Sequence, residues 1–229
     1  MKINVIIPVF NEGDSIGLVL NDIPANWVEE VIVVNNGSTD DTARVAQAAG
    51  ATVLLETDRG YGAACLKGMQ YIKDKNPVNQ PDIIVFMDGD YADYPEQMKD
   101  LVAPIINNEA DMVIGSRLKG NRERGSMMVQ QIFGNWLATR MMRWLFKAKF
   151  SDLGPFRAIR WRSLQLLNMQ DTNYGWTIEM QIKAVKNNIR YTEIPVNYRK
   201  RIGTSKVSGT IKGTILAGYK IIFTILKYA

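Results

Sequence analysis

Five short apolar runs in the first half of the chain have the length and composition of buried β-strands. They occupy residues 3–9, 31–34, 52–55, 82–87 and 111–115. Between these runs, apolar residues recur every three or four positions, which is the period of an amphipathic helix. Strands that alternate with helices at this spacing predict an α/β fold with a mostly parallel central sheet flanked by helices.

The helices of this alternation carry ordinary start and stop signals. The predicted helices cover residues 16–23, 43–49 and 63–72, a fourth begins at Pro95, and a fifth opens at Trp176. Hydroxyl and acidic residues just before the second helix are typical of a helix N-terminus, and a glycine follows its last residue. These signals support the alternating pattern independently of the apolar periodicity.

Two later stretches, residues 127–148 and 210–229, place large apolar residues on one helical face and polar residues on the other. The apolar positions of the first are Val129, Ile132, Phe133, Trp136, Leu137, Met141, Trp144, Leu145 and Ala148, opposite Gln130, Gln131, Asn135, Thr139, Arg143 and Lys147. In the second, Ile211, Ile215, Tyr219, Ile222 and Leu226 share a face, while Lys212, Lys220 and Lys227 recur about every two turns. This pattern predicts C-terminal amphipathic helices that lie in a membrane interface. The alternative is that both helices cap the core or form a dimer interface.

Composition excludes several classes of chemistry. The 229 residues contain no histidine, which removes histidine triads, histidine bases and histidine metal ligands. The one cysteine, Cys65, excludes an internal disulfide and fits a reducing compartment. No apolar stretch reaches 18 residues, and the chain enters its first strand without a signal-like segment. We therefore expect a cytoplasmic protein that is peripheral at the cytoplasmic membrane face.

The formal net charge of +5 conceals two halves of opposite sign. Residues 1–116 carry 7 Lys and Arg and 18 Asp and Glu, a net charge of −11, whereas residues 117–229 carry 21 and 5, a net charge of +16. An acidic half suits a metal ion, and a basic half suits phosphates or an anionic membrane surface. No nucleic-acid-binding motif accompanies the basic half, so we do not expect a nucleic-acid partner.

The acidic half contains the sequence Asp88-Gly89-Asp90 directly after the predicted strand 82–87. Alternate residues of a strand point the same way, so the two carboxylates can share one target at the carboxyl end of the strand. In an open α/β sheet, ligands bind at that end. A divalent cation that also holds substrate phosphates would relieve the repulsion between the two charges.

Several motifs together resemble glycosyltransferase family 2, and in particular its branch of dolichol-phosphate mannosyltransferases and polyprenyl-phosphate glycosyltransferases. They are the runs at residues 6–12, 33–42, 88–90, 115–117, 151–157 and 198–206, in the order the family has them. The resemblance implies a GT-A fold, which is a Rossmann-like nucleotide-sugar domain. It also implies inverting transfer from a nucleotide-sugar with Mg²⁺ or Mn²⁺.

The resemblance assigns a nucleotide-sugar site to the first half of the chain. Its residues would be Pro8, Val9, Glu12, Asn36, Asp58, Gly60, Lys67, Asp88, Gly89 and Asp90. Asp88 and Asp90 would hold the metal and the diphosphate, and Asn36 would lie beside the base or ribose. The family usually has two acids where this chain has Asn35-Asn36, so charge-assisted contacts are lost there.

The second half supplies the expected acceptor and diphosphate contacts, which are Arg117, Arg199, Arg201, Ser205 and Lys206. Arg117 would contact a phosphate, and the loop 199–209 resembles the mobile loop of the family that closes over the diphosphate. Asp152 matches the acceptor-site aspartate of the family and, with Asp90, is a candidate catalytic residue. It could orient the acceptor or act as a base, or it could be the structural partner of a nearby arginine.

These observations predict a single catalytic domain over residues 1–209, with a nucleotide-sugar half at 1–116, an acceptor half at 117–209 and a C-terminal helix at 210–229. The expected activity is transfer of a sugar from a UDP- or GDP-sugar to a polyprenyl phosphate at the membrane surface. An anionic phosphate acceptor needs no strong base, which suits a chain without histidine. The alternatives are transfer to a sugar or lipid hydroxyl, or sugar-nucleotide binding without turnover. A homo-oligomer is compatible with the apolar helical faces.

Overall fold

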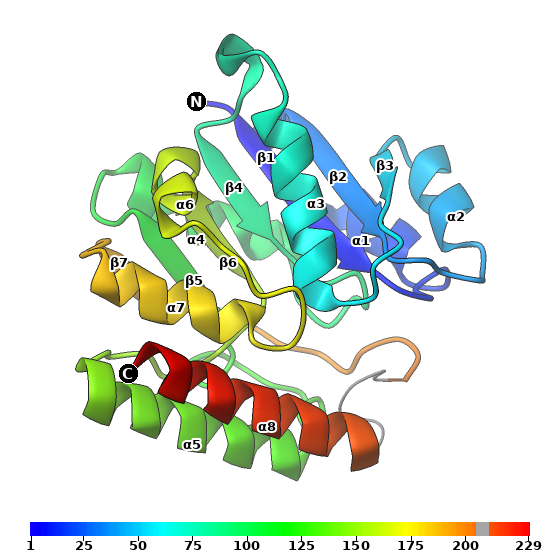
Figure 1. Ribbon diagram of the computed structural model, residues 1–229. Helices are drawn as coiled ribbons and strands as arrows, with labels where there is room; N and C mark the ends of the chain where they lie inside the picture. The colour runs from blue at the N-terminus through cyan, green and yellow to red at the C-terminus, as the bar shows by residue number, and fades with distance from the viewer. Residues whose placement is uncertain (205–210) are drawn as a thin grey trace.

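The computed structural model describes residues 1–204 and 211–229, and within them the chain forms one sheet of seven strands (Figure 1). The strands are β1 Ile3–Val9, β2 Glu30–Asn35, β3 Thr52–Leu55, β4 Ile83–Phe86, β5 Met112–Ser116, β6 Arg157–Arg160 and β7 Tyr191–Pro195. Their order across the sheet is β3-β2-β1-β4-β6-β5-β7. All neighbouring strands are parallel except β6, which runs antiparallel to both β4 and β5.

The α/β fold and the mostly parallel sheet expected from the sequence are confirmed. The five predicted strands agree with β1 to β5 to within two residues at either end. Every residue of β1 and of β4 is buried, because helices cover both faces of the sheet and leave no solvent-facing side on its central strands. This double coverage explains why those strands read as continuous apolar runs in the sequence.

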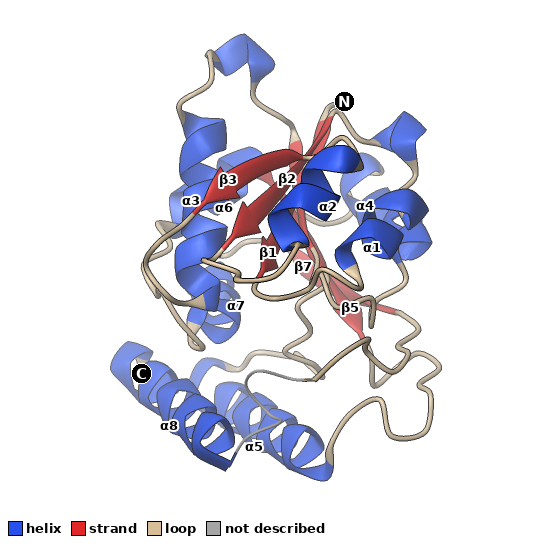
Figure 2. Ribbon diagram, turned by 90° about the vertical axis from the view of Figure 1, so that its right-hand side faces the viewer, coloured by secondary structure: helices blue, strands red, loops and turns tan. Residues whose placement is uncertain are grey.

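Helices pack on both faces of the sheet (Figures 1 and 2). One face carries α1 Ile16–Asp22, α2 Thr42–Ala48 and α4 Met98–Ile106, and the other carries α3 Tyr61–Lys73, α6 Trp161–Leu167 and α7 Trp176–Lys186. Short 3-10 turns lie at Ala25–Trp27, Pro77–Asn79 and Pro95–Gln97. Each face has its own apolar core.

Two long helices, α5 Val129–Phe146 and α8 Ile211–Tyr228, lie side by side as a further layer below the α7 side of the sheet (Figures 1 and 2). Both amphipathic stretches are therefore helical, as the sequence predicts. Ile225 of α8 is fully buried in the core beneath α7, and the Tyr228 hydroxyl donates to Glu179 Oε1 of α7 at 2.7 Å. These contacts attach the two-helix layer to the rest of the fold.

The face of α5 that packs against the protein is its partly polar one. Asn135 and Thr139 are buried together with Ala138 and Met142, whereas Trp144 is 82% exposed and Val129 is 81% exposed. Asn135 bridges to the following turn, because its Nδ2 donates to the Ser151 carbonyl at 2.9 Å and its Oδ1 accepts from the Leu153 amide at 2.8 Å. The buried polar residue is thus satisfied, and most of the apolar stripe faces solvent.

The exposed apolar side chains continue from α5 onto α8. They are Val129, Ile132, Phe133, Trp136 and Trp144 of α5, and Ile215, Leu216, Tyr219, Phe223 and Leu226 of α8. No helix among the described residues combines the length and the apolar character needed to cross a membrane.

Candidate active site

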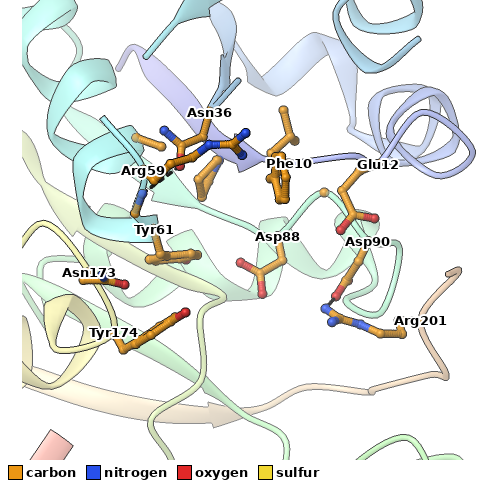
Figure 3. Close-up of a pocket in the computed structure, with 15 residues that line it drawn as sticks. Phe10, Glu12, Asn36, Arg59, Tyr61, Asp88, Asp90, Asn173, Tyr174 and Arg201 are labelled. Atoms are coloured by element: carbon orange, nitrogen blue, oxygen red, sulfur yellow. Dashed lines mark hydrogen bonds and ion pairs between the residues drawn. The ribbon is translucent and has the colours of Figure 1, made fainter. Parts of the chain in front are cut away.

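The carboxyl ends of β1, β2 and β4 open onto a pocket of about 350 Å³ (Figure 3). Pro8 and Val9 end β1, and Phe10 and Glu12 follow it. Asn36 follows β2, and residues 88–90 follow β4. Arg59 and Gly60 come from the turn before α3, and Tyr61 is its first residue. Parallel neighbours in register bring these ends to the same edge of the sheet. The pocket therefore lies where an open α/β sheet binds ligands.

Most of the residues predicted for the nucleotide-sugar site line this pocket. They are Pro8, Val9, Glu12, Asn36, Gly60, Asp88, Gly89 and Asp90, joined by Arg201 from the predicted diphosphate set. Asp58 and Lys67 do not line it, and both side chains are exposed. Their roles, like those of the lining residues, stay predictions.

Asn36 organises the wall of the pocket next to β2. Its Nδ2 donates to the carbonyls of Glu56 at 3.1 Å and Asp58 at 2.7 Å, and its Oδ1 accepts from the Gly60 amide at 2.8 Å. A carboxylate could not donate to the two carbonyls. The amide at this position is therefore suited to holding the 56–60 loop, in addition to bordering the pocket.

Two glycines allow the start of α3 to approach another part of the chain. A Cβ atom on Gly60 would overlap the carbonyl oxygen of Thr172, and one on Gly62 would overlap that of Asp171. The Ala63 amide donates to the Thr172 carbonyl at 2.8 Å, which fixes this approach. The glycines thus bring the 171–174 segment, including Asn173 and Tyr174, to the pocket (Figure 3).

Sequence reasoning missed further lining residues, namely Phe10, Arg59, Tyr61, Ala64, Asn173 and Tyr174. The Arg59 guanidinium lies 4.1 Å from the centroid of the Phe10 ring, an arrangement in which a cation and an aromatic face attract each other. A sequence signal for this pair was available, since Phe10 lies within the motif at residues 6–12 and Arg59 lies between the predicted site residues Asp58 and Gly60. The 171–174 segment has no such signal, because only the tertiary fold brings it here.

Asp88 and Asp90 present carboxylates to the pocket, and a guanidinium lies against one of them (Figure 3). Asp88 keeps part of its surface exposed, but its Oδ1 is shielded from solvent and has no hydrogen-bond partner among the described residues. Asp90 is buried, its Oδ1 accepts from the Ala92 amide at 2.9 Å, and its Oδ2 forms an ion pair with Arg201. The pair shows that this position attracts a cation.

The donor set fits Mg²⁺ or Mn²⁺ bound together with substrate phosphates. Among the described residues, no group of three or more His, Cys, Asp or Glu side chains comes together as a metal site. Two carboxylates are what Mg²⁺ commonly takes from a protein when waters and phosphates complete its shell. Asp88 and Asp90 are thus the residues that could hold such an ion.

A third acid, Asp93, lies buried beside this pair and was not predicted. Neither of its carboxylate oxygens has a hydrogen-bond partner in the described part of the chain. Burial, with a further contribution from the negative charge of Asp88, raises the pKa of Asp93 to about 7. Burial likewise raises the pKa of Asp88, against the opposing effect of Arg201. Burial is thus the main cause of both shifts, and the neighbouring charge of Asp88 adds to the rise at Asp93.

Arg117 and Asp152 form a buried ion pair next to these acids. Arg117 Nε lies 3.0 Å from Asp152 Oδ2 and Nη2 lies 2.7 Å from Oδ1, and the Arg117 amide also donates to Oδ2. Burial alone would raise the pKa of Asp152, but the charge and hydrogen bonds of Arg117 hold that pKa below its usual range. Asp152 has no exposed surface. The geometry is that of a structural partner of an arginine, one of the alternatives considered from the sequence.

Two further charged residues fix the turn that carries Asp152. Glu193 accepts from the Ser151 amide at 2.7 Å and from the Asp152 amide at 3.2 Å. Arg157 is fully buried and donates to the carbonyls of Leu153, Gly154 and Thr177, so it binds the turn to α7. Burial lowers the pKa of Arg157 to about 10, so this guanidinium still carries its charge at neutral pH.

The other residues of the predicted acceptor and diphosphate set are Arg199, Ser205 and Lys206. Arg199 stacks on the rings of Tyr91 and Tyr94, with its Cζ 3.3 Å and 4.3 Å from their centroids, and its Nε donates to the Tyr91 carbonyl at 2.6 Å. It thus anchors the segment that leads to Arg201. Ser205 and Lys206 lie outside the described residues.

Comparisons with known proteins agree with this geometry. The model of glycosyl transferase family 2 matches residues 4–167. An uncharacterized glycosyltransferase of Mycobacterium tuberculosis is 32% identical over 223 residues, which cover 94% of each chain. The undecaprenyl-phosphate mannosyltransferase of Micrococcus luteus is 30% identical over 234 residues, which cover 93% of this chain and 90% of its own.

The fold is also found among solved structures. The glucosyl-3-phosphoglycerate synthase of Mycobacterium tuberculosis, in complex with Mn²⁺, UDP and phosphoglyceric acid, superimposes with a TM-score of 0.77 at 21% identity. The match covers 99% of this chain and 78% of the synthase, and it identifies the fold as GT-A. Taken with the family match, this likeness shows that the chain is a glycosyltransferase and belongs to glycosyl transferase family 2.

Proposed function

We propose that this glycosyltransferase moves a sugar, with inversion, from a nucleotide diphosphate sugar to a polyprenyl phosphate at a membrane surface. The observation that carries the proposal is the placement of Arg117. Its charge lowers the pKa of Asp88 in the pocket, against the larger effect of burial, and the same residue borders the space between α5 and α8. A phosphate held by Arg117 would lie between a donor site and an exposed apolar layer.

The donor side rests on the pocket at the ends of β1, β2 and β4. Asp88 and Asp90 would hold a divalent cation and, through it, the donor diphosphate. The cation, when bound, would stabilise the charge that develops on the departing nucleoside diphosphate. Arg201, which now pairs with Asp90, would be free to move onto a phosphate oxygen once another cation neutralises that carboxylate.

A phosphate acceptor suits the chemistry that the residues offer. A phosphate monoester already carries a nucleophilic oxyanion at neutral pH, so its attack on the sugar needs no general base. Asp152 engages Arg117 through both carboxylate oxygens and is shielded from solvent, which makes it a poor base for a hydroxyl acceptor. Arg117 has five N–H donors, and the ion pair with Asp152 uses two of them. The rest suit a phosphate oxygen.

The α5–α8 layer supports the membrane part of the proposal. Its outer surface carries tryptophan, phenylalanine, tyrosine and aliphatic residues, and Lys227 is exposed near the end of α8. Lys220 is instead paired with Asp171 at 3.0 Å. Transfer of one large apolar side chain out of water is worth about 2 kcal/mol, so several together suffice for reversible binding. The relative from Micrococcus luteus is named as acting on undecaprenyl phosphate, which supports a lipid phosphate here.

A transfer assay tests the activity. Purified protein is incubated with labelled UDP- and GDP-sugars, undecaprenyl phosphate and Mn²⁺, and product is followed with and without excess EDTA. We expect transfer from at least one donor, abolished by EDTA and severely reduced in Asp90→Asn. Undiminished transfer in EDTA would reject the role of the metal. Transfer to a hydroxyl acceptor, with none to undecaprenyl phosphate, would reject the proposed phosphate acceptor.

A vesicle assay tests the membrane role separately. Trp144→Ser removes an exposed indole from α5, and Trp27→Ser removes one from the 3-10 turn before β2, outside the α5–α8 layer. We expect Trp144→Ser to bind anionic vesicles about thirty-fold more weakly than wild type, because about 2 kcal/mol of apolar transfer is lost. Trp27→Ser should bind like wild type. Equal binding by both variants would contradict membrane contact through α5.

A further inference from the structure

The segment 171–174 contributes Asn173 and Tyr174 to the wall of the pocket (Figure 3). Its backbone is pressed against the start of α3, where the Ala63 amide donates to the Thr172 carbonyl at 2.8 Å. The segment is a loop between α6 and α7. Side-chain contacts, in place of a regular backbone ladder, must therefore hold its shape.

Asp171 supplies the contacts within this loop. Its Oδ1 accepts from the amides of Asn173 at 2.8 Å and Gly175 at 3.2 Å. Its own amide donates to Glu179 Oε2 of α7 at 2.8 Å. The loop is thus folded around the Asp171 carboxylate, directly beside the two residues that reach the pocket.

Helix α8 contacts this loop through three polar residues spaced four apart, which share one face of the helix. Lys220 Nζ lies 3.0 Å from Asp171 Oδ2, and the Tyr228 hydroxyl, two turns further on, bonds to α7. Thr224 lies between them, so close to Gly175 that a Cβ atom on this glycine would lie 2.5 Å from Thr224 Oγ1. The inner face of α8 is therefore fitted to the loop.

The ion pair between Lys220 and Asp171 links α8 to the shape of the loop. The Asp171 side chain is 9% exposed and the Lys220 side chain is 36% exposed, so the pair is partly shielded from water and its attraction is stronger than at an open surface. The loop amides use Oδ1 and the lysine uses Oδ2. Removing the cation leaves a largely buried carboxylate without its opposite charge, which favours rotation of that carboxylate toward solvent.

We infer that Lys220 is a positioning residue of the proposed donor site. It acts through Asp171 to hold Asn173 and Tyr174 at the pocket, so a helix outside the α/β sheet determines part of the nucleotide-sugar site. This inference rests on the proposed binding of the donor in this pocket. It goes beyond that proposal because it adds α8 to the elements that shape the pocket.

Two substitutions remove the ion pair in different ways. Lys220→Met keeps the aliphatic stem and removes the positive charge, whereas Asp171→Asn keeps an oxygen for the loop amides and removes the negative charge. Lys220→Arg preserves the charge. Lys99→Met is the matched control, because it removes a lysine from an exposed position of α4, on the other face of the sheet.

Three measurements are made on each full-length variant. Hydrogen–deuterium exchange of residues 60–64 reports on the pocket wall that the loop contacts. Titration calorimetry with UDP and with GDP, in the presence of Mn²⁺, gives the dissociation constant of the nucleotide. The melting temperature reports on the stability of the fold as a whole.

We expect Lys220→Met and Asp171→Asn each to speed exchange at residues 60–64 and to weaken nucleotide binding about ten-fold, because partners in one hydrogen-bonded network are coupled by roughly this factor. The double variant should bind no more weakly than either single variant. Lys220→Arg and Lys99→Met should behave like wild type.

A lower melting temperature in Lys220→Met with an unchanged nucleotide dissociation constant would overturn the inference, because it would give the ion pair a structural role alone. Unchanged exchange at residues 60–64, or equal changes in Lys99→Met, would overturn it as well. Faster exchange in Lys220→Met, together with no binding of either nucleotide by wild type, would support the positioning of the wall and refute the donor role of the pocket.

Discussion

Replacing Asp93 with asparagine should change how the stability of the protein depends on pH. Asp93 is buried beside Asp88, and the described residues give its carboxylate oxygens no hydrogen-bond partner. Its pKa in the folded protein is raised from 3.8 to about 7. Asparagine has nearly the same shape and does not titrate in this range, so the variant removes the titration while it preserves the volume of the side chain.

The sign and size of the effect follow from proton linkage. A carboxyl with a higher pKa when folded binds more protons in the folded state, so its stabilising contribution is complete below about pH 4 and is lost as the pH rises to about 7. One pKa unit is worth about 1.4 kcal/mol, so wild type loses about 3 kcal/mol from this group between pH 5 and pH 8. For a chain of 229 residues, that corresponds to roughly 6–12 °C in melting temperature.

The assay is urea unfolding of Asp93→Asn and wild type at half-unit steps from pH 5 to pH 8. EDTA is present throughout, because a cation bound near Asp88 would add its own charge. The free energy of unfolding of the variant minus that of wild type should grow by about 3 kcal/mol across the range, whatever constant offset the amide introduces. Asp100→Asn, at an exposed position of α4, should give a flat difference. A flat difference for Asp93→Asn as well would refute the reasoning.

Two other predictions concern the pocket at the carboxyl ends of β1, β2 and β4. Asn36→Asp leaves the carbonyls of Glu56 and Asp58 without their hydrogen-bond donor. We therefore expect urea unfolding to show a free energy of unfolding about 1–3 kcal/mol lower than that of wild type. An unchanged free energy of unfolding would mean that these hydrogen bonds are dispensable. Arg201→Gln removes the cation that pairs with Asp90, so Mn²⁺ should bind more tightly in the absence of nucleotide when free Mn²⁺ is followed by electron paramagnetic resonance. Equal or weaker Mn²⁺ binding would show that Arg201 does not compete for the carboxylate.

The sequence was informative wherever a local pattern determines structure. The strands β1 to β5 are apolar runs with helices between them, so their period and length sufficed. β6, with the sequence Arg157-Ala158-Ile159-Arg160, is too short and too charged to be recognised, although its first arginine is fully buried. β7 lies at the edge of the sheet and is only partly buried, so its residues lack the apolar character of the central strands.

Periodicity also could not show which face of α5 points inward. The buried Asn135 is satisfied by Ser151 and Leu153, and such hydrogen bonds between distant residues leave no trace in a helical pattern. The same limit applies to the pairing of Arg117 with Asp152, since 35 residues separate them. The sequence predicted an acceptor-site role for both, but only the fold shows that each is the other's partner.

The position of β6 has a consequence for the order in which the protein can be assembled during synthesis. β4 carries the Asp88–Asp90 turn at its end, and the strand that completes its outer side comes from residues 157–160. Until those residues leave the ribosome, β4 presents an unpaired apolar edge, which is a template for association with other chains. β5 is the next strand along the chain, but it does not cover this edge of β4. In the finished sheet, β5 pairs with β6 and β7 instead. The part of the sheet that carries the Asp88–Asp90 turn is therefore complete only after residues 157–160 have been made.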